Sequence, residues 1–313
     1  PELRKAMAGW YARYYGVEGI DPARQVLPLI GSKEGVLNIA LAFLNPGDGV
    51  LVPNPGYPTY TSASRIALAE IFPYELSEEN GWLPDFEALE RLPLERIKLM
   101  WVNYPHMPTG TPASIELFER LVDFGRRHGI VIVNDNPYSF IRNDRPLSIL
   151  QVEGAADIAI EMNSLSKCLN MAGWRVGMLV SNPVFVEWVL KVKSNIDSGQ
   201  PRAIMEGAVA ALAAGPEWYS ALNAEYGRRA RIAEEIMSEL GCSVAPGQQG
   251  LFLWGRIPDD ASGSEAFADS VLDRARVFIT PGFIFGSAGE RYVRISLCAP
   301  EAVLAEALRR IRL

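Results

Sequence analysis

Residues 158–167 read IAIEMNSLSK, an apolar run that passes through two serines to Lys167. The run is continuous rather than alternating, which is typical of a strand buried on both faces of a sheet. Similar runs occur at residues 26–30, 49–52, 97–103, 130–134 and 176–181. Segments with helical periodicity lie between them, at 32–43, 60–69 and 114–128. Strands that alternate with helices predict an α/β fold whose mostly parallel sheet is covered by helices.

The pattern changes in the C-terminal third of the chain. The sequence predicts an alanine-rich helix, a long helix, three short strands and a final helix, at residues 203–214, 217–240, 251–254, 277–279, 292–297 and 300–311. This order indicates a smaller C-terminal α+β domain. A chain of 313 residues also exceeds the ~100–200 residues of an ordinary domain. We therefore expect a large domain over residues 1–222 and a small domain over residues 223–313.

The composition is that of an acidic globular protein. Hydrophobic residues make up 49% of the chain and charged residues 21%, which excludes a disordered chain. The net charge of −7 disfavours a nucleic-acid partner, and no apolar run reaches the ~18–20 residues of a membrane helix. Charged residues at the start of the chain argue against a signal peptide. The chain does not begin with Met, which indicates a trimmed chain or a fragment.

The three cysteines are Cys168, Cys242 and Cys298, and they lie far apart. Their odd number and wide spacing predict neither a disulfide framework nor a metal site, and they fit a reducing, cytoplasmic location. Cys168 lies beside Lys167, but no histidine motif accompanies it. We therefore expect Cys168 to be a buried, small hydrophobic residue.

Lys167 differs from the other five lysines because it directly follows a predicted buried strand. Ligands of α/β sheets bind at the carboxyl ends of the strands. A lysine that is partly desolvated there can lose its proton and attack a carbonyl group. Two hydroxyls, Ser164 and Ser166, and the guanidinium of Arg175 surround this lysine in the sequence. Hydroxyls and a guanidinium suit a phosphate group.

A second phosphate-suited segment is residues 29–35, LIGSKEG, in which an apolar strand leads through Gly31, Ser32 and Lys33 into a helix. Free backbone N–H groups and the dipole at a helix N-terminus attract anions. Taken alone, this segment is equally compatible with a plain helix N-cap.

A third segment is residues 132–138, IVNDNPY, which places Asp135 at the end of a predicted buried strand. A buried carboxylate is costly without a cationic partner, and a protonated pyridine nitrogen would be such a partner. Asp135 and Tyr138 could then reach one ring from two sides. The alternative is that Asp135 caps the next helix.

Together these segments resemble the class I and II aminotransferases of fold type I, which depend on pyridoxal 5′-phosphate. The resemblance covers essentially the whole chain, and the motifs keep the family's order. Further matching segments are NPGYPTY at 54–60, NYPHMPTG at 103–110, TPGFIFG at 280–286 and YVRIS at 292–296. Six motifs in register, without counting the segment at 29–35, are strong evidence, although each alone is modest evidence.

The resemblance implies a role for each matching residue. Lys167 would form the Schiff base with the cofactor, Asp135 would pair with the pyridine nitrogen, and Tyr138 would donate to the ring O3′. Tyr57 would stack on the ring, and Arg294 would hold the substrate α-carboxylate. The phosphate-side residues would be Ser164, Ser166 and Arg175. The helix N-terminus at Gly31, Ser32 and Lys33 is expected, on its own pattern, to bind the cofactor as well. Taken singly, Tyr57 could instead be a core aromatic residue, and Arg294 a charge at the rim of an edge strand.

These roles predict an aminotransferase that moves an amino group between an α-amino acid and a 2-oxo acid. Glutamate and 2-oxoglutarate are the expected pair by analogy, and the family implies a homodimer. Two alternatives remain open at this stage. A β-eliminating lyase needs the same lysine and ring contacts, and aminotransferase-like domains also occur as effector-sensing parts of transcription regulators.

The sequence departs from the family at two places. Met107 stands where the family normally has an asparagine that donates to O3′, and a thioether cannot donate a hydrogen bond. We therefore predict an internal aldimine with a higher pKa than in relatives that carry asparagine, unless water or a neighbouring side chain supplies the bond. The family also has an N-terminal region ahead of the segment that matches residues 1–4. We expect a chain without this region to bind substrate poorly.

Overall fold

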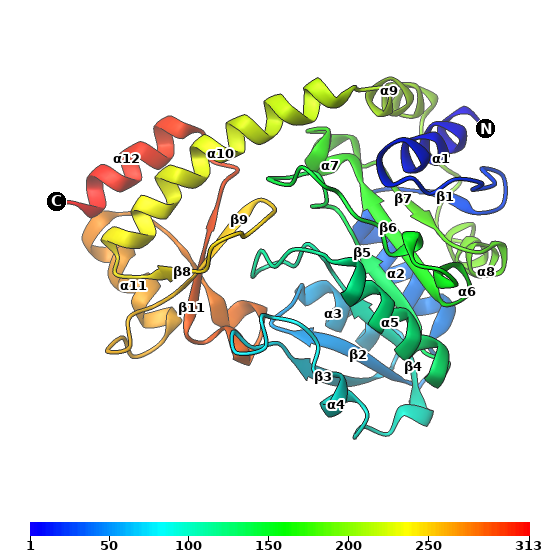
Figure 1. The fold of residues 1–313 in the computed structure, drawn as a ribbon, viewed down its shortest axis with the longest axis horizontal. Coiled ribbons are helices and arrows are strands. Elements are labelled where there is room, and N and C mark those ends of the chain that lie inside the picture. The colour runs from blue at the N-terminus through cyan, green and yellow to red at the C-terminus, as the bar shows by residue number, and fades with distance from the viewer.

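The computed structural model describes residues 1–313, and its largest element is a seven-stranded sheet (Figure 1). Its strands run in the order β1-β7-β6-β5-β4-β2-β3. Only β7 is antiparallel to its neighbours, so the predicted mostly parallel sheet is confirmed. The strands are β1 (Val26–Leu29), β2 (Gly49–Asn54), β3 (Glu70–Glu75), β4 (Ile97–Val102), β5 (Val131–Asp135), β6 (Ala159–Ser164) and β7 (Gly177–Val180).

Six of these strands match the predicted apolar runs, and β3 was not predicted. Every residue of β2, β5, β6 and β7 is buried, as expected for strands covered on both faces. β3 lies at the edge of the sheet and pairs only with β2. Most of its residues are partly or fully exposed, and it begins and ends with glutamate. An edge strand of this kind lacks the continuous apolar run that marks the others.

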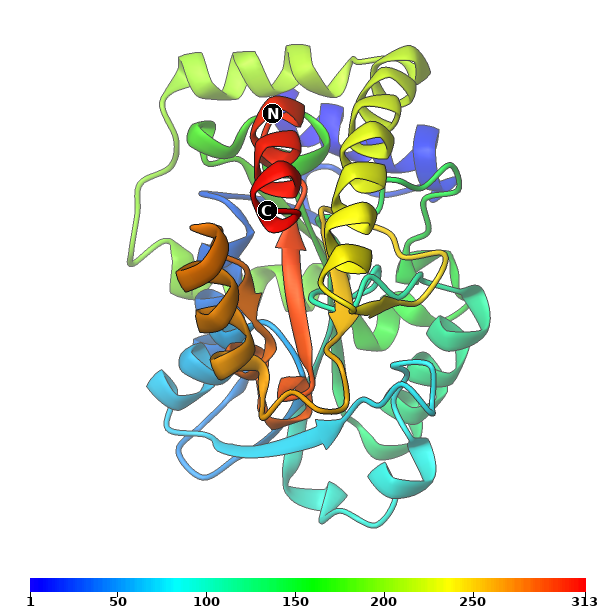
Figure 2. The ribbon, with the colours of Figure 1, turned by 90° about the vertical axis from the view of Figure 1, so that its left-hand side faces the viewer.

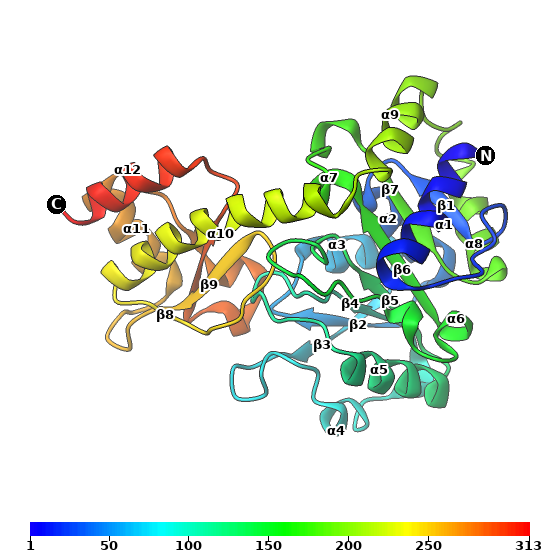
Figure 3. The same cartoon turned by 45° about the horizontal axis from the view of Figure 1, so that its top comes forward.

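Helices cover both faces of the large sheet (Figures 1 and 3). Successive side chains of β4 show the two layers, because alternate residues of a strand point to opposite faces. Leu99 and Trp101 pack with residues of α2, α3 and α8, whereas Met100 and Val102 pack with residues of α4 and α5. The helices of this part are α1 (Glu2–Tyr15), α2 (Ser32–Phe43), α3 (Pro58–Ile66), α4 (Phe86–Leu89), α5 (Ile115–His128), α6 (Ala155–Ile158), α7 (Leu165–Cys168), α8 (Pro183–Lys193) and α9 (Arg202–Leu212).

The C-terminal part contains a four-stranded antiparallel sheet in the order β10-β11-β9-β8. Helix α10 runs from the neighbourhood of α9 to this sheet, and α12 lies beside α10 (Figures 1 and 2). The predicted domain boundary at residue 222 falls within α10 and stays a prediction. The elements are α10 (Pro216–Glu239), β8 (Ser243–Val244), β9 (Phe252–Arg256), α11 (Ser264–Ala275), β10 (Thr280–Pro281), β11 (Tyr292–Ser296) and α12 (Glu301–Ile311).

One predicted strand is wrong. Residues 277–279 are apolar, but they form no strand, and pairing with β11 begins only at Thr280. Phe278 is 69% exposed although Ile279 is buried, so the apolar run does not form one face of a sheet. In the same structure, no helix is both long enough and apolar enough to cross a bilayer.

Candidate active site

A cavity of about 400 Å³ lies where the carboxyl ends of β5 and β6 face the small sheet. Ten of the predicted site residues line it: Ser32, Lys33, Tyr57, Asp135, Tyr138, Ser164, Ser166, Lys167, Arg175 and Arg294. Gly31 does not line the cavity itself, but it contacts the Arg175 side chain at the cavity's edge. Residues that lie up to 262 positions apart in the sequence (Ser32 and Arg294) are therefore brought together in one site.

Asp135 ends β5 and is only 4% exposed. Its Oδ2 accepts a hydrogen bond of 3.0 Å from Tyr60 Oη, whereas its buried Oδ1 has no partner. Burial raises the pKa of Asp135 to about 7, although the hydrogen bond from Tyr60 acts in the opposite direction. The Tyr60 ring stacks on Trp101 at 5.1 Å, which fixes the hydroxyl that holds the carboxylate. Asp135 is thus a fixed acceptor with one oxygen free to face a donor in the cavity.

Lys167 lies in α7, a single helical turn that follows β6 directly. Ser164 caps this turn, because its Oγ accepts a hydrogen bond of 3.2 Å from the Ser166 N–H. The Lys167 side chain is half-buried, and its Nζ has neither an ion-pair partner nor a hydrogen-bond partner within the protein. An unpaired amine at the edge of a cavity is suited to form a covalent bond with a carbonyl group. Cys168, as predicted, is buried, and burial raises the pKa of its thiol to about 12.

Gly31 and Arg175 approach each other closely at one end of the cavity. Gly31 is the N-cap of α2 and has a φ of 75°, a conformation that favours glycine. A Cβ atom at this position would lie 2.2 Å from Arg175 Nη2, so no other residue fits without displacing the guanidinium. No side chain caps α2, which leaves its first backbone N–H groups available. A guanidinium beside an open helix N-terminus is suited to bind an anion, and Ser32 and Lys33 begin this helix.

Arg294 lies on β11, which is an inner strand of the small sheet, so the alternative of an edge-strand charge is excluded. Its Cζ lies 3.9 Å from the ring centroid of Phe252 and 4.5 Å from that of Phe285. Its Nη1 donates to Met107 Sδ at 3.3 Å, and its buried Nε has no partner. Burial lowers the pKa of Arg294 to about 10, so the guanidinium keeps its charge at neutral pH. A half-buried cation without a carboxylate partner is suited to bind an anionic ligand.

A model of the family described as aminotransferase class I and II matches residues 1–311. The chain belongs to this family. The LL-diaminopimelate aminotransferase of Dehalococcoides mccartyi is 42% identical over 313 residues, which cover 99% of this chain and 80% of that protein. The LL-diaminopimelate aminotransferase of Aquifex aeolicus is 40% identical, with the same coverage of both chains. The solved apo structure of BacF from Bacillus subtilis has a TM-score of 0.95 and 37% identity, and the match covers 100% of this chain and 80% of BacF.

Membership of the class I and II aminotransferases makes this protein a pyridoxal-phosphate-dependent aminotransferase. The comparisons give no support to the lyase or to the regulator domain that the sequence alone left open. The residues present also fit the cofactor. The buried, unpartnered Oδ1 of Asp135 can accept from a protonated pyridine nitrogen, and the site formed by Gly31, Ser32 and Arg175 suits a phosphate.

Tyr138 and Tyr57 add two aromatic hydroxyl groups to the aminotransferase cavity. Burial, followed by the charge of Asp135, raises the pKa of Tyr138, so its hydroxyl remains a donor at neutral pH. The Tyr138 ring packs edge-on against Phe252 at 5.9 Å. Tyr57 is half-buried and contacts Tyr60 edge-on at 5.5 Å. Tyr57 therefore borders the cavity rather than filling the core.

Several aminotransferase-site residues were not predicted: Tyr60, Asn103, Phe252 and Phe285. Asn103 donates through Nδ2 to the carbonyl oxygen of Asp135, and its Oδ1 accepts the Met107 N–H at 2.8 Å. Tyr60 and Asn103 belong to motifs that the sequence analysis singled out, but their partner Asp135 is 75 and 32 residues away. Phe285 also belongs to a matching segment, 280–286, whereas Phe252 does not, and the sequence gives no sign that either ring contacts Arg294.

Proposed function

We propose that this aminotransferase uses Lys167 as the residue that bonds to the cofactor and transfers protons at the substrate Cα. The observation that carries the proposal is that three side chains line one cavity: Lys167, whose amine has no partner, Asp135, whose Oδ1 has no hydrogen-bond partner, and Arg294, which has no carboxylate partner. Bound pyridoxal phosphate supplies an electron sink for the electrons that remain when the Cα proton leaves. Asp135 holds a proton at the ring nitrogen, and Arg294 orients the substrate carboxylate.

We further propose LL-diaminopimelate as the amino donor and a 2-oxo acid, by analogy 2-oxoglutarate, as the acceptor. The support is the set of relatives at about 40–42% identity across nearly the whole chain, which carry the name LL-diaminopimelate aminotransferase. Within the cavity, the cationic Arg294 suits the carboxylate at the reacting carbon.

The test of the chemistry is Lys167→Ala. We expect this variant to lose the visible absorbance of the bound cofactor and to slow the half-reaction by at least about 10⁴-fold, since both covalent capture and proton transfer depend on the amine. The matched control is Lys191→Ala, because Lys191 is 68% exposed in its side chain and pairs only with Glu187. Native half-reaction rates in Lys167→Ala would overturn the assignment.

The test of the substrate is a panel of amino donors with 2-oxoglutarate as the acceptor. LL-diaminopimelate should give the highest kcat/KM, and aromatic or aliphatic amino acids should be slower. A higher value for an aromatic donor would overturn the substrate, while the transaminase chemistry would stand.

We also propose a homodimer in the cytoplasm. Family resemblance supports the dimer, and large apolar side chains such as Trp188 and Ile196 are exposed and available for an interface. The cytoplasm is supported by three unpaired cysteines, of which Cys298 is exposed. Light scattering of the purified protein tests the dimer, and cell fractionation tests the location.

A further inference from the structure

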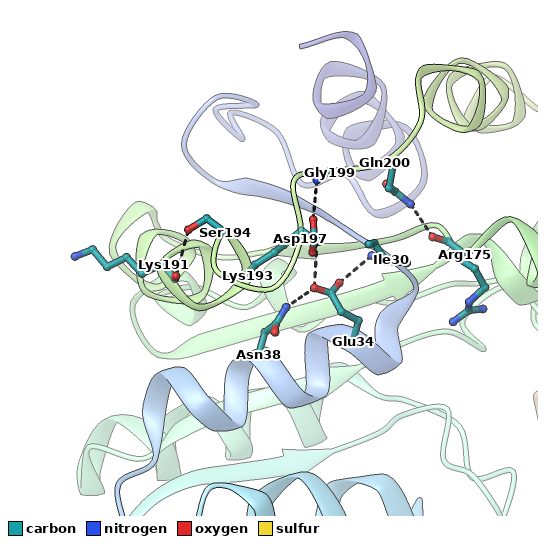
Figure 4. Close-up of polar contacts among 10 residues, drawn as sticks. All are labelled: Ile30, Glu34, Asn38, Arg175, Lys191, Lys193, Ser194, Asp197, Gly199 and Gln200. Carbon is teal, nitrogen blue, oxygen red and sulfur yellow. Dashed lines mark hydrogen bonds and ion pairs between the residues drawn. The ribbon is translucent and has the colours of Figure 1, made fainter.

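Lys193, the last residue of α8, is a buried cation outside the active-site cavity (Figure 4). Only 7% of the residue is exposed. Its Nζ donates to Glu34 Oε1 at 3.1 Å and to Asp197 Oδ2 at 2.6 Å. The two carboxylate side chains are themselves only 18% and 15% exposed. Such a cluster is costly to bury unless every oxygen is paired, which makes its geometry specific.

The remaining carboxylate oxygens are paired with groups of two different segments. Glu34 Oε2 accepts the Ile30 N–H at 2.8 Å, and Glu34 Oε1 also accepts from Asn38 Nδ2. Asp197 Oδ1 accepts the Gly199 N–H at 2.8 Å. All four carboxylate oxygens therefore have donors, and Lys193 is the only cation that joins the two acids.

Both segments lead directly to the phosphate side of the site. Ile30 precedes Gly31, so Glu34 fixes the turn that opens α2. On the other side, Gln200 follows the turn at Gly199 and donates through Nε2 to the carbonyl oxygen of Arg175 at 2.7 Å. Figure 4 shows Glu34 and Asp197 beside Lys193, the contact of Asp197 with Gly199, and the separate contact of Gln200 with Arg175.

Gly31 and Arg175 lie so close together that neither segment can shift far. A Cβ atom at Gly31 would already lie 2.2 Å from Arg175 Nη2. Arg175 itself has a left-handed backbone, with a φ of 55°, which a non-glycine residue adopts only when its surroundings hold it. A shift of either segment by about 1 Å would therefore misplace the guanidinium relative to the open N-terminus of α2.

We propose that Lys193 is a positioning residue that holds the opening of α2 and Arg175 in register for the cofactor phosphate. Lys193 does not line the active-site cavity; its side chain borders a separate hollow of about 750 Å³. It acts through Glu34 and Asp197, not by contact with the cofactor. The inference rests on the proposed phosphate side of the site. It adds Lys193, which belongs to none of the motifs that resemble the family.

The test compares the affinity of the cofactor-free protein for pyridoxal phosphate with its affinity for pyridoxal, which lacks the phosphate. We expect Lys193→Met to weaken the binding of pyridoxal phosphate by at least about tenfold and the binding of pyridoxal by less than about threefold. Residues that orient a binding group, without touching the ligand, typically change affinity by about 10–100-fold when they are replaced. The control Lys191→Met lies on the same helix, is exposed and pairs with Glu187, so it should change neither affinity. Arg175→Met serves as the reference for direct loss of a phosphate contact.

Each outcome has a meaning. An equal loss of affinity for both ligands in Lys193→Met, or no loss, overturns the inference. A phosphate-selective loss in Arg175→Met without one in Lys193→Met leaves the site standing and removes Lys193 from it. No phosphate-selective loss in Arg175→Met overturns the phosphate side proposed above.

If circular dichroism shows that Lys193→Met does not fold, Gln200→Ala decides, because it removes one contact from a half-buried side chain. A selective loss of about threefold supports the inference, and none overturns it.

Discussion

Asp135 at the end of the large sheet and Arg294 on the small sheet are charged side chains that line the same cavity, and they are held in different ways. Asp135 is fixed by neutral hydrogen bonds: Tyr60 donates to its carboxylate and Asn103 to its main-chain carbonyl. Arg294 has no such partner. Two aromatic rings and the sulfur of Met107 surround its guanidinium.

This difference separates a rigid end of the site from an adaptable one. Hydrogen bonds fix direction, whereas aromatic faces and a thioether tolerate several orientations of a guanidinium. The Asp135 end belongs to the buried large sheet and suits a cofactor that stays in one position. The Arg294 end belongs to the small sheet and suits substrates that enter and leave. An aminotransferase needs both properties, because a donor and an acceptor use the same site in turn.

Of the two ends, the rigid one should show the larger effect when its charge is removed. Asp135→Asn keeps an acceptor for Tyr60 but cannot hold a proton on the ring nitrogen. We expect kcat/KM to fall by about 10²–10³-fold, the range found when one electrostatic partner of a transition state is lost. Steady-state kinetics on LL-diaminopimelate measures this. Tyr60→Phe removes only the orienting hydroxyl, so its kcat/KM should lie between those of the wild type and Asp135→Asn. A loss of kcat/KM below about tenfold in Asp135→Asn would contradict the proposed role of Asp135.

The same carboxylate should make the stability of the cofactor-free protein depend on pH. Its pKa is raised to about 7 in the folded state by burial, against about 3.9 in an unfolded chain. Between these values the folded state binds more protons than the unfolded state, so stability is lost as the pH rises from about 4 to 7. The full difference amounts to about 4 kcal/mol as an upper bound.

Urea unfolding of the cofactor-free protein at pH 5 and pH 8 measures this effect. The wild type should lose more stability than Asp135→Asn over this interval, since the variant has no group to titrate. Parallel pH dependences in the two proteins would show that Asp135 is already ionised, with a compensating partner, before the cofactor binds.

At the adaptable end the expected effect is smaller and of another kind. Arg294→Gln should raise KM by about 10–100-fold, because a charge-assisted hydrogen bond contributes ~1.5–3 kcal/mol, while kcat should change less. Arg256→Gln is the matched control, since Arg256 lies on the neighbouring strand β9, is exposed and pairs with Asp259. A fall in kcat as large as that of Asp135→Asn would remove the distinction between the two ends.

The large sheet could be predicted from the sequence because its strands are buried on both faces and read as continuous apolar runs. The edge strand β3 and the short strand β10 could not, since pairing with a neighbour, rather than their own pattern, makes them strands. For the same reason the apolar run at 277–279 does not form a strand: apolar residues alone do not determine where the hydrogen bonds to β11 begin.

The residues that we propose to bond to the cofactor or substrate could be singled out from the sequence, because they stand in recognisable motifs, and the structure brings them to one cavity. The residues that orient them could not. Tyr60 meets Asp135 across 75 residues, and Lys193 reaches Glu34 across 159 residues. A hydrogen bond between distant segments leaves no periodicity in either of them.

The smallest expected effect tests whether Met107 belongs to the rigid or to the adaptable end. Its thioether touches Arg294, but it stands where the family carries an asparagine that donates to the cofactor ring. One N–H of Asn103 Nδ2 donates to the Asp135 carbonyl, and Met107→Asn would add a donor at the position where the family has one. Met107→Asn should therefore lower the pKa read from the cofactor absorbance by about 1–2, as expected for one added hydrogen bond to a charged oxygen.

Met107→Leu separates the two ends, because it loses the sulfur contact with Arg294 without adding a donor. It should leave the absorbance pKa unchanged and affect KM alone. An unchanged pKa in Met107→Asn would mean that water or another side chain already supplies the bond to the ring. A lowered pKa in Met107→Leu would mean that Met107 acts on the cofactor through Arg294, so that the two ends of the site are coupled.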